Sequence, residues 1–118
     1  MHVVHDTVLV VVPGYENSEK LDEFIKEVPE EYKEYFLKVF AVNGYISYII
    51  SPDGSGESFQ TSNDMGELRK KFIEIAKTYR CDIVHIRFGG DWCLQQGSPC
   101  VMYSKNLKGN EKCANNYD

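Results

Sequence analysis

The order of strand-like and helix-like segments between residues 7 and 92 constrains the fold of this chain more than any other feature. Apolar β-branched runs and stretches with helical spacing follow one another as strand, helix, strand, strand, helix, strand. Two strand–helix–strand halves joined by a hairpin are typical of the ferredoxin-like sandwich. We therefore predict an α+β fold with an antiparallel sheet in the order 4-1-3-2 and with helices on one face.

The first half begins with a strand over 7–12, a continuous β-branched run. Such a run indicates burial on both faces and hence a central place in the sheet. Ser18 occupies the N-cap position of a helix whose apolar residues recur at helical spacing as far as Val28. Pro29 ends that helix and begins a second, short one over 30–36.

The centre of the chain predicts a hairpin. Apolar runs over 37–42 and 45–50 are separated by Asn43 and Gly44, which supply the two positive φ angles of a type I′ turn. We expect the two runs to be neighbouring antiparallel strands.

The second half consists of a helix and a last strand over 82–88. Ser62, Asn63 or Asp64 is the expected helix cap. An alternative sheet of different order adds residues 101–103 as a fifth strand. The predicted core contains Val10, Phe24, Leu68, Phe72, Val84 and Ile86.

With 118 residues, the chain is long enough for one domain, which we place at residues 1–103, followed by a flexible tail at 104–118. No run approaches the ~18 apolar residues of a membrane span, and the N-terminus does not resemble a signal peptide. We expect a cytoplasmic protein that binds no membrane and is a monomer or a dimer in isolation.

The charge is unevenly distributed. Residues 1–59 carry 11 acids and 4 bases, a balance of −7, and eight of these acids lie between Glu16 and Glu34. The acidic stretch is either a solvated helix face or a docking surface for a basic partner. Nucleic-acid binding needs clustered Lys and Arg, so we expect no nucleic-acid partner.

The cysteines do not predict a metal site or a cofactor. Cys93, Cys100 and Cys113 lack the tight pairs that zinc sites present, and no glycine-rich phosphate loop is found. A Cys93–Cys100 disulfide would form only in an oxidising compartment. Cys81 is expected to be a small core residue.

His85 is the best single candidate for proton chemistry because its ordinary pKa lies near neutrality. Arg87 lies on the same strand, and Asp91 follows it closely in the sequence. No nucleophile or catalytic motif accompanies these residues, so we expect no catalytic residues. A small-ligand site or an enzyme using these three residues is the alternative function.

Aromatic residues interrupt the acidic stretch, and aromatic side chains dominate binding hot spots. The competing interpretation is that these rings pack beneath the short helix. The predicted protein-binding residues are Asp22, Glu23, Lys26, Tyr32, Tyr35, Phe36 and Trp92.

In size, acidity and lack of a catalytic set, the chain resembles small phage-encoded anti-defence inhibitors. This resemblance is one of general character and rests on no diagnostic motif. It implies a non-enzymatic inhibitor that docks on a larger protein and blocks it. The implied target is a bacterial immune effector in the host cytoplasm, such as a nuclease or a sirtuin-type NADase.

Overall fold

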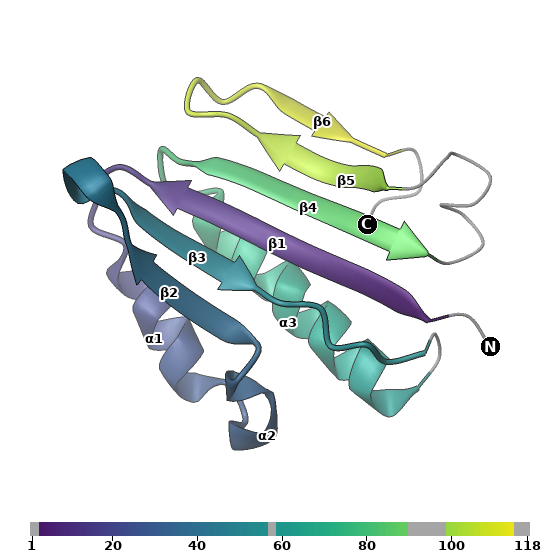
Figure 1. The fold of residues 1–118 in the computed structure, drawn as a ribbon. Helices are drawn as coiled ribbons and strands as arrows, with labels where there is room; N and C mark the ends of the chain where they lie inside the picture. Colours follow the sequence, from purple (N-terminus) through teal and green to yellow (C-terminus); the bar gives the residue numbers. More distant parts are fainter. Residues whose placement is uncertain (1–2, 57–58, 90–98, 115–118) are drawn as a thin grey trace.

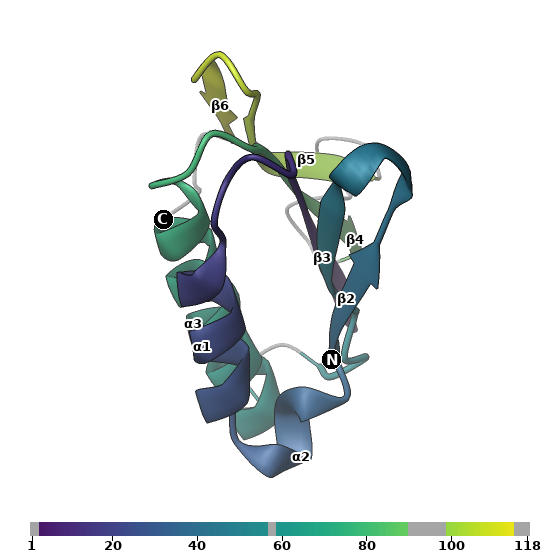
Figure 2. The ribbon, with the colours of Figure 1, turned by 90° about the vertical axis from the view of Figure 1, so that its left-hand side faces the viewer.

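The computed structural model describes residues 3–56, 59–89 and 99–114 as one antiparallel sheet with helices on one face (Figures 1 and 2). The sheet order is β2-β3-β1-β4-β5-β6. The strands are β1 (Val4–Val12), β2 (Phe36–Phe40), β3 (Ile46–Ile50), β4 (Asp82–Gly89), β5 (Cys100–Lys105) and β6 (Glu111–Cys113). The helices are α1 (Glu19–Glu27), α2 (Glu30–Lys33) and α3 (Gln60–Ala76), with a 3-10 turn, η1, at Val42–Gly44.

The α+β prediction is confirmed at the level of an antiparallel sheet with three helices. The sheet has six strands where the main prediction had four, and β5 and β6 are its additional members. The fifth strand is the one that the alternative interpretation placed at residues 101–103. The predicted tail boundary at residue 104 falls inside β5, and residues 111–113 pair with that strand.

The main core lies between the helices and the alternate residues of β1. Val8, Val10 and Val12 are fully buried there, together with Phe72 of α3. Phe24 and Leu68 pack against this cluster but are only partly buried. Cys81 is a buried core residue as predicted, and desolvation by burial raises the pKa of its thiol to about 11.

Val84 and Ile86 were predicted in the core, and this assignment is wrong. Val10 pairs with Ile83 across the sheet, so Ile83 and His85 face the helices while Val84 and Ile86 face away. The apolar set of β4 is Val84, Ile86 and Phe88, whereas the set that faces the helices carries His85 and Arg87. Strand periodicity therefore favoured the wrong face, because the two polar side chains of the helix-facing set pair with the buried Asp6. The expectation that β1 is buried on both faces is also incorrect for the described residues, because Leu9 is 36% exposed.

Several predicted boundaries shift by a few residues. The short helix ends at Lys33, and Phe36 is already the first residue of β2. Helix α3 begins at Gln60, before all three predicted caps, and Phe59 occupies its N-cap position. Ser18 is at the N-cap of α1 as predicted, but its side chain makes no cap bond. The Ser18 hydroxyl lies 2.8 Å from the Tyr48 hydroxyl instead.

The predicted hairpin between β2 and β3 forms, and Asn43 and Gly44 have the expected positive φ angles, 64° and 78°. The turn itself differs from the prediction: the strands are joined through the 3-10 turn at Val42–Gly44 instead of a two-residue type I′ turn, so β2 already ends at Phe40 and β3 begins at Ile46. In the described parts of the chain, no helix is both long enough and apolar enough to span a membrane.

Candidate functional site

The charged residues predicted to bind a partner, Asp22, Glu23 and Lys26, lie on α1, and Glu23 and Lys26 are exposed. Asp22 is partly buried and has an internal role. Its carboxylate accepts a hydrogen bond from Lys38 Nζ at 2.9 Å and one from the Tyr48 hydroxyl at 2.8 Å. Burial and the bond to Asp22 raise the pKa of Tyr48 to about 12. Asp22 therefore ties α1 to β2 and β3.

The predicted aromatic patch does not form on the surface. Tyr32 and Phe36 belong to the buried core, and Tyr35 is partly buried against it. The Tyr32 hydroxyl donates to Asp64 at 2.8 Å, and the Phe36 ring lies 6.1 Å from the Phe72 ring. These side chains stabilise the contact between helices and sheet. Trp92 lies outside the described residues.

Among the described residues, the two most exposed large apolar side chains lie at the end of the β2–β3 hairpin. Phe40 is 75% exposed and Val42 is 81% exposed, and Tyr45 is also exposed. The turn after β1 reaches this end, because a Cβ on Gly14 would lie 2.7 Å from the Gly44 carbonyl oxygen. We call Phe40, Val42 and Tyr45 the hairpin-end surface.

Strand β2 is the outermost strand of the sheet beside this surface (Figure 1). Tyr35 O accepts a hydrogen bond from Ser51 N at 2.7 Å, and Ala41 N donates to Tyr45 O at 2.8 Å. Antiparallel strands alternate the direction of their backbone groups. Since Tyr35 and Ala41 point towards β3, the N–H and C=O groups of the even-numbered residues 36, 38 and 40 point away from the sheet. We call this outward row the β2 edge.

A hollow of about 420 Å³ lies between α1 and the helix-facing side of β2. Its apolar lining comes from Ile25 and Phe36, and its charged lining from Asp22, Lys26 and Lys38. The Lys38 ammonium also lies over the Phe40 ring, 4.8 Å from its centroid. Three predicted binding residues, Asp22, Lys26 and Phe36, thus line a depression next to the β2 edge.

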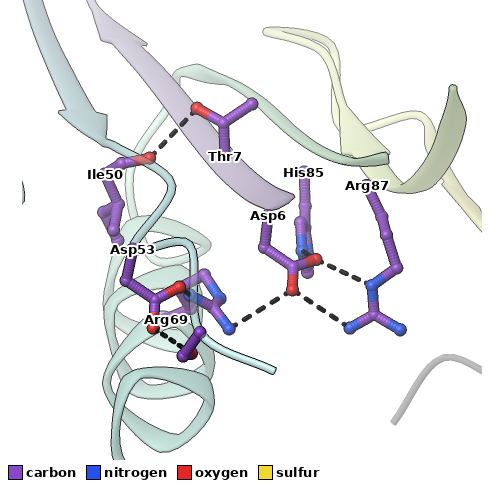
Figure 3. A network of polar contacts seen from close by, with 8 residues as sticks. Asp6, Thr7, Ile50, Asp53, Arg69, His85 and Arg87 are labelled. Carbon is purple, nitrogen blue, oxygen red and sulfur yellow. Dashed lines mark hydrogen bonds and ion pairs between the residues drawn. The ribbon is translucent and has the colours of Figure 1, made fainter. Parts of the chain in front are cut away.

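A second polar cluster lies between β1, β4 and α3 (Figure 3). The buried Asp6 carboxylate is 2.8 Å from His85 Nε2 and accepts a hydrogen bond from Arg87 Nε at 2.9 Å. Arg69 donates to the same carboxylate at 3.3 Å, and its other terminal nitrogen lies 3.9 Å from Asp53. These charged groups are directed towards one another.

The electrostatics of this cluster favour a charged Asp6. Burial alone would raise the pKa of its carboxyl, but the hydrogen bonds from His85 and Arg87 and the charges of Arg69 and Arg87 outweigh burial. The pKa of Asp6 therefore lies well below its usual value. The two carboxylates of Asp6 and Asp53 balance the two guanidinium groups of Arg69 and Arg87. Because these contacts join residues of β1, β4 and α3, the cluster is suited to holding the three elements together.

Sequence reasoning identified His85 and Arg87 but missed Asp6 and Arg69. The partner expected for His85, Asp91, lies outside the described residues, and the carboxylate beside His85 is that of Asp6. A signal was present: Asp6 keeps the alternation of Val8 and Val10, which places a charge on the buried face.

Within the described ranges, no group of three or more His, Cys, Asp or Glu side chains is arranged to hold a metal ion. Comparisons with protein-family models, curated proteins and solved structures found no match to this chain.

Proposed function

We propose that this protein binds a larger protein without catalysing a reaction, and that an extended segment of the partner adds to the sheet along the β2 edge. The observation that carries the proposal is the outward backbone of residues 36, 38 and 40 on an exposed outer strand. Addition of a strand supplies main-chain hydrogen bonds for affinity, and alternate side chains supply specificity.

The composition of β2 supports this proposal. Natural proteins protect outer strands with charges, prolines or bulges because unpaired edges recruit other chains. Strand β2 carries a single charge, Lys38, which is held by Asp22. Leu37 and Val39 are about half exposed, and Phe40 is more exposed still. An apolar edge of this kind is suited to a partner strand.

The surroundings of the edge indicate which partner fits. On the helix side, alternate side chains of an added strand would lie over the hollow lined by Ile25 and Phe36. The acidic exposed face of α1 would attract a partner with a basic surface during encounter. The hairpin-end surface adds apolar contact area at one end of the strand.

We further infer that β1 to β4 with α1 and α3 form a ferredoxin-like unit, on which β5 and β6 are an addition. The general resemblance to phage anti-defence inhibitors makes bacterial immune effectors the first partners to test. Such an inhibitor would act in the host cytoplasm by covering a functional surface of a nuclease or of a sirtuin-type NADase.

The decisive variants are Phe40→Pro and Phe40→Ala. Both remove the exposed ring, but only proline removes an outward N–H, and it leaves the bonds to β3 intact because that N–H points away from β3. In surface plasmon resonance against purified effectors, we expect Phe40→Pro to bind at least ~10-fold more weakly than Phe40→Ala. Equal affinities of the two folded variants would show that the partner does not pair with β2.

Charge on α1 should act mainly on the association rate. Glu23 and Glu27 are exposed, and Asp22 is left intact because it anchors Lys38 and Tyr48. We expect Glu23→Lys with Glu27→Lys to slow association and to flatten its salt dependence, with little effect on dissociation. The matched control is Glu67→Lys with Glu74→Lys, which reverses two exposed charges on α3 and so changes the net charge by the same amount. A control that slows association equally would contradict steering by α1.

A further inference from the structure

The sheet surface opposite the helices is apolar over its centre. We call this surface the open face; in Figure 2 it is the side of the sheet away from α1 and α3. The pairing register places Leu37, Ile49, Leu9 and Val84 in one row across β2, β3, β1 and β4. The other apolar residues of the face are Val11, Val39, Ile86, Phe88 and Val101.

Charged side chains on the open face of β1 to β4 are confined to strand ends among the described residues. Asp82 lies at one end and the imidazole of His5 near the other, and the central rows carry no ionisable side chain. An antiparallel sheet with one solvated face usually alternates apolar and polar residues. Here β1 is apolar on both faces from Val8 to Val12, although helices cover one face only. Exposed apolar patches of this kind mark interaction surfaces.

We propose that the open face is the interface of a homodimer, in which two copies pack their sheets face to face about a two-fold axis. In such an arrangement the central Leu9 and Ile49 of one copy lie over the same region of the other, so every apolar row meets an apolar row. Sheet-on-sheet packing at about 10 Å is a standard way to bury two such faces. The second copy supplies the burial that the continuous apolar run of β1 predicted.

The open face is large enough to be the interface with a second copy of the chain. Five strands spaced about 4.8 Å apart and about 20 Å long make a face on the order of 500 Å² in plan. Protruding side chains raise its accessible area towards the ~800 Å² that each partner buries in a standard interface. Homodimer interfaces are also more apolar than those of transient complexes. A face without central charges provides no electrostatic means of selecting a different protein.

This inference does not depend on the proposed function. Face-to-face packing leaves the β2 edge and the hairpin-end surface free, so each dimer would offer two edges to partners. The two proposals can therefore fail separately.

Sedimentation velocity and light scattering over a wide concentration range test the interface. We expect wild type to approach twice the chain mass of 13.6 kDa as concentration rises. Leu9→Lys places a charge at the centre of the face, and Leu37→Lys places one at a more exposed point. Each should weaken dimerisation by at least about 100-fold. Val42→Lys, a matched change at the hairpin end, should leave it unchanged. Circular dichroism melts show which variants are folded, and Leu37→Lys suffices if Leu9→Lys unfolds.

Three outcomes would overturn the proposal. The first is a wild type that stays at the monomer mass at every concentration. The second is that both folded lysine variants dimerise like wild type. In the third, Phe40→Pro would dissociate the dimer while Leu37→Lys does not, which would move the interface to the β2 edge.

Discussion

Asp6 is the residue on which the buried polar cluster depends. Its carboxylate accepts hydrogen bonds from both Arg69 and Arg87 and lies beside His85. Removing one member of a buried ion-pair network leaves the remaining charges uncompensated, at a cost of about 3 kcal/mol or more. The net effect of the whole cluster on stability is therefore smaller than the effect of breaking it.

We predict that Asp6→Asn lowers the free energy of unfolding by about 3 kcal/mol, measured by urea denaturation. Glu74→Gln is the matched control, because that exposed side chain forms an ion pair with Lys77 on the surface of α3 and should matter little. A loss in Asp6→Asn no larger than that of the control would mean that Asp6 does not hold the cluster together.

The pH dependence of stability follows from the same carboxyl. Because the pKa of Asp6 is lower in the fold than in the unfolded chain, its contribution is present above the unfolded value of about 3.9. The contribution is lost as pH falls from there towards the lower folded pKa. We expect the unfolding free energy of wild type to fall more steeply below about pH 4 than that of Asp6→Asn. If the unfolding free energies of wild type and Asp6→Asn fell in parallel with pH, Asp6 would not be the source of the acid destabilisation.

Burial of individual side chains in the core was predictable where the strand or helix periodicity was unambiguous. Val10 and Phe72 follow their strand and helix periodicities into the core. For Tyr32 and Phe36 the sequence left two interpretations open, because aromatic rings suit both a binding surface and a core, and the structure places both rings in the core. The location of β2 decides between the two roles, and sequence alone placed the start of that strand one residue late.

At the scale of elements, the hairpin is held against the turn that follows β1. Gly14 lies so close to Gly44 that a side chain cannot fit without moving backbone atoms. This contact fixes the direction of the hairpin and hence of the β2 edge.

We predict that Gly14→Ala destabilises the protein by about 1 kcal/mol or more, because the new Cβ would lie 2.7 Å from the Gly44 carbonyl oxygen. Gly66→Ala in α3 is the contrasting variant, because its Cβ would meet only the Arg69 side chain at 3.9 Å. It should stabilise the helix by up to about 1 kcal/mol. Thermal denaturation monitored by circular dichroism gives both values. If the two variants shifted the melting temperature equally and in the same direction, the close contact between Gly14 and Gly44 would be contradicted.

Element order was more predictable than face assignment. Strand and helix periods are local properties, so most elements appear within a few residues of their predicted bounds. The direction of a strand face depends on register with its neighbours, and in β4 the set that faces the helices carries His85 and Arg87 beside Ile83. Strand β6 is only three residues long, too short for periodicity to reveal.

At the scale of the whole molecule, the helices cover one face of the sheet and leave the opposite face uncovered by helices (Figure 2), and β2 is an outer strand of the sheet. Neither the β2 edge nor the open face is a sequence motif. Both follow from which strands are neighbours, and that arrangement was only partly predictable. The sheet therefore has a buried core on its helix side and the two surfaces for which we propose binding of other chains.

Amide hydrogen exchange followed by NMR, on the complex with a partner or with a peptide selected for binding, tests the central claim most directly. In the free protein, the amides of Lys38 and Phe40 should exchange fast, while those of Leu37 and Val39 are protected by β3. Binding should protect Lys38 and Phe40 and leave the other two unchanged. Protection that appears elsewhere, with Lys38 and Phe40 still exchanging fast in the complex, would contradict binding along the β2 edge.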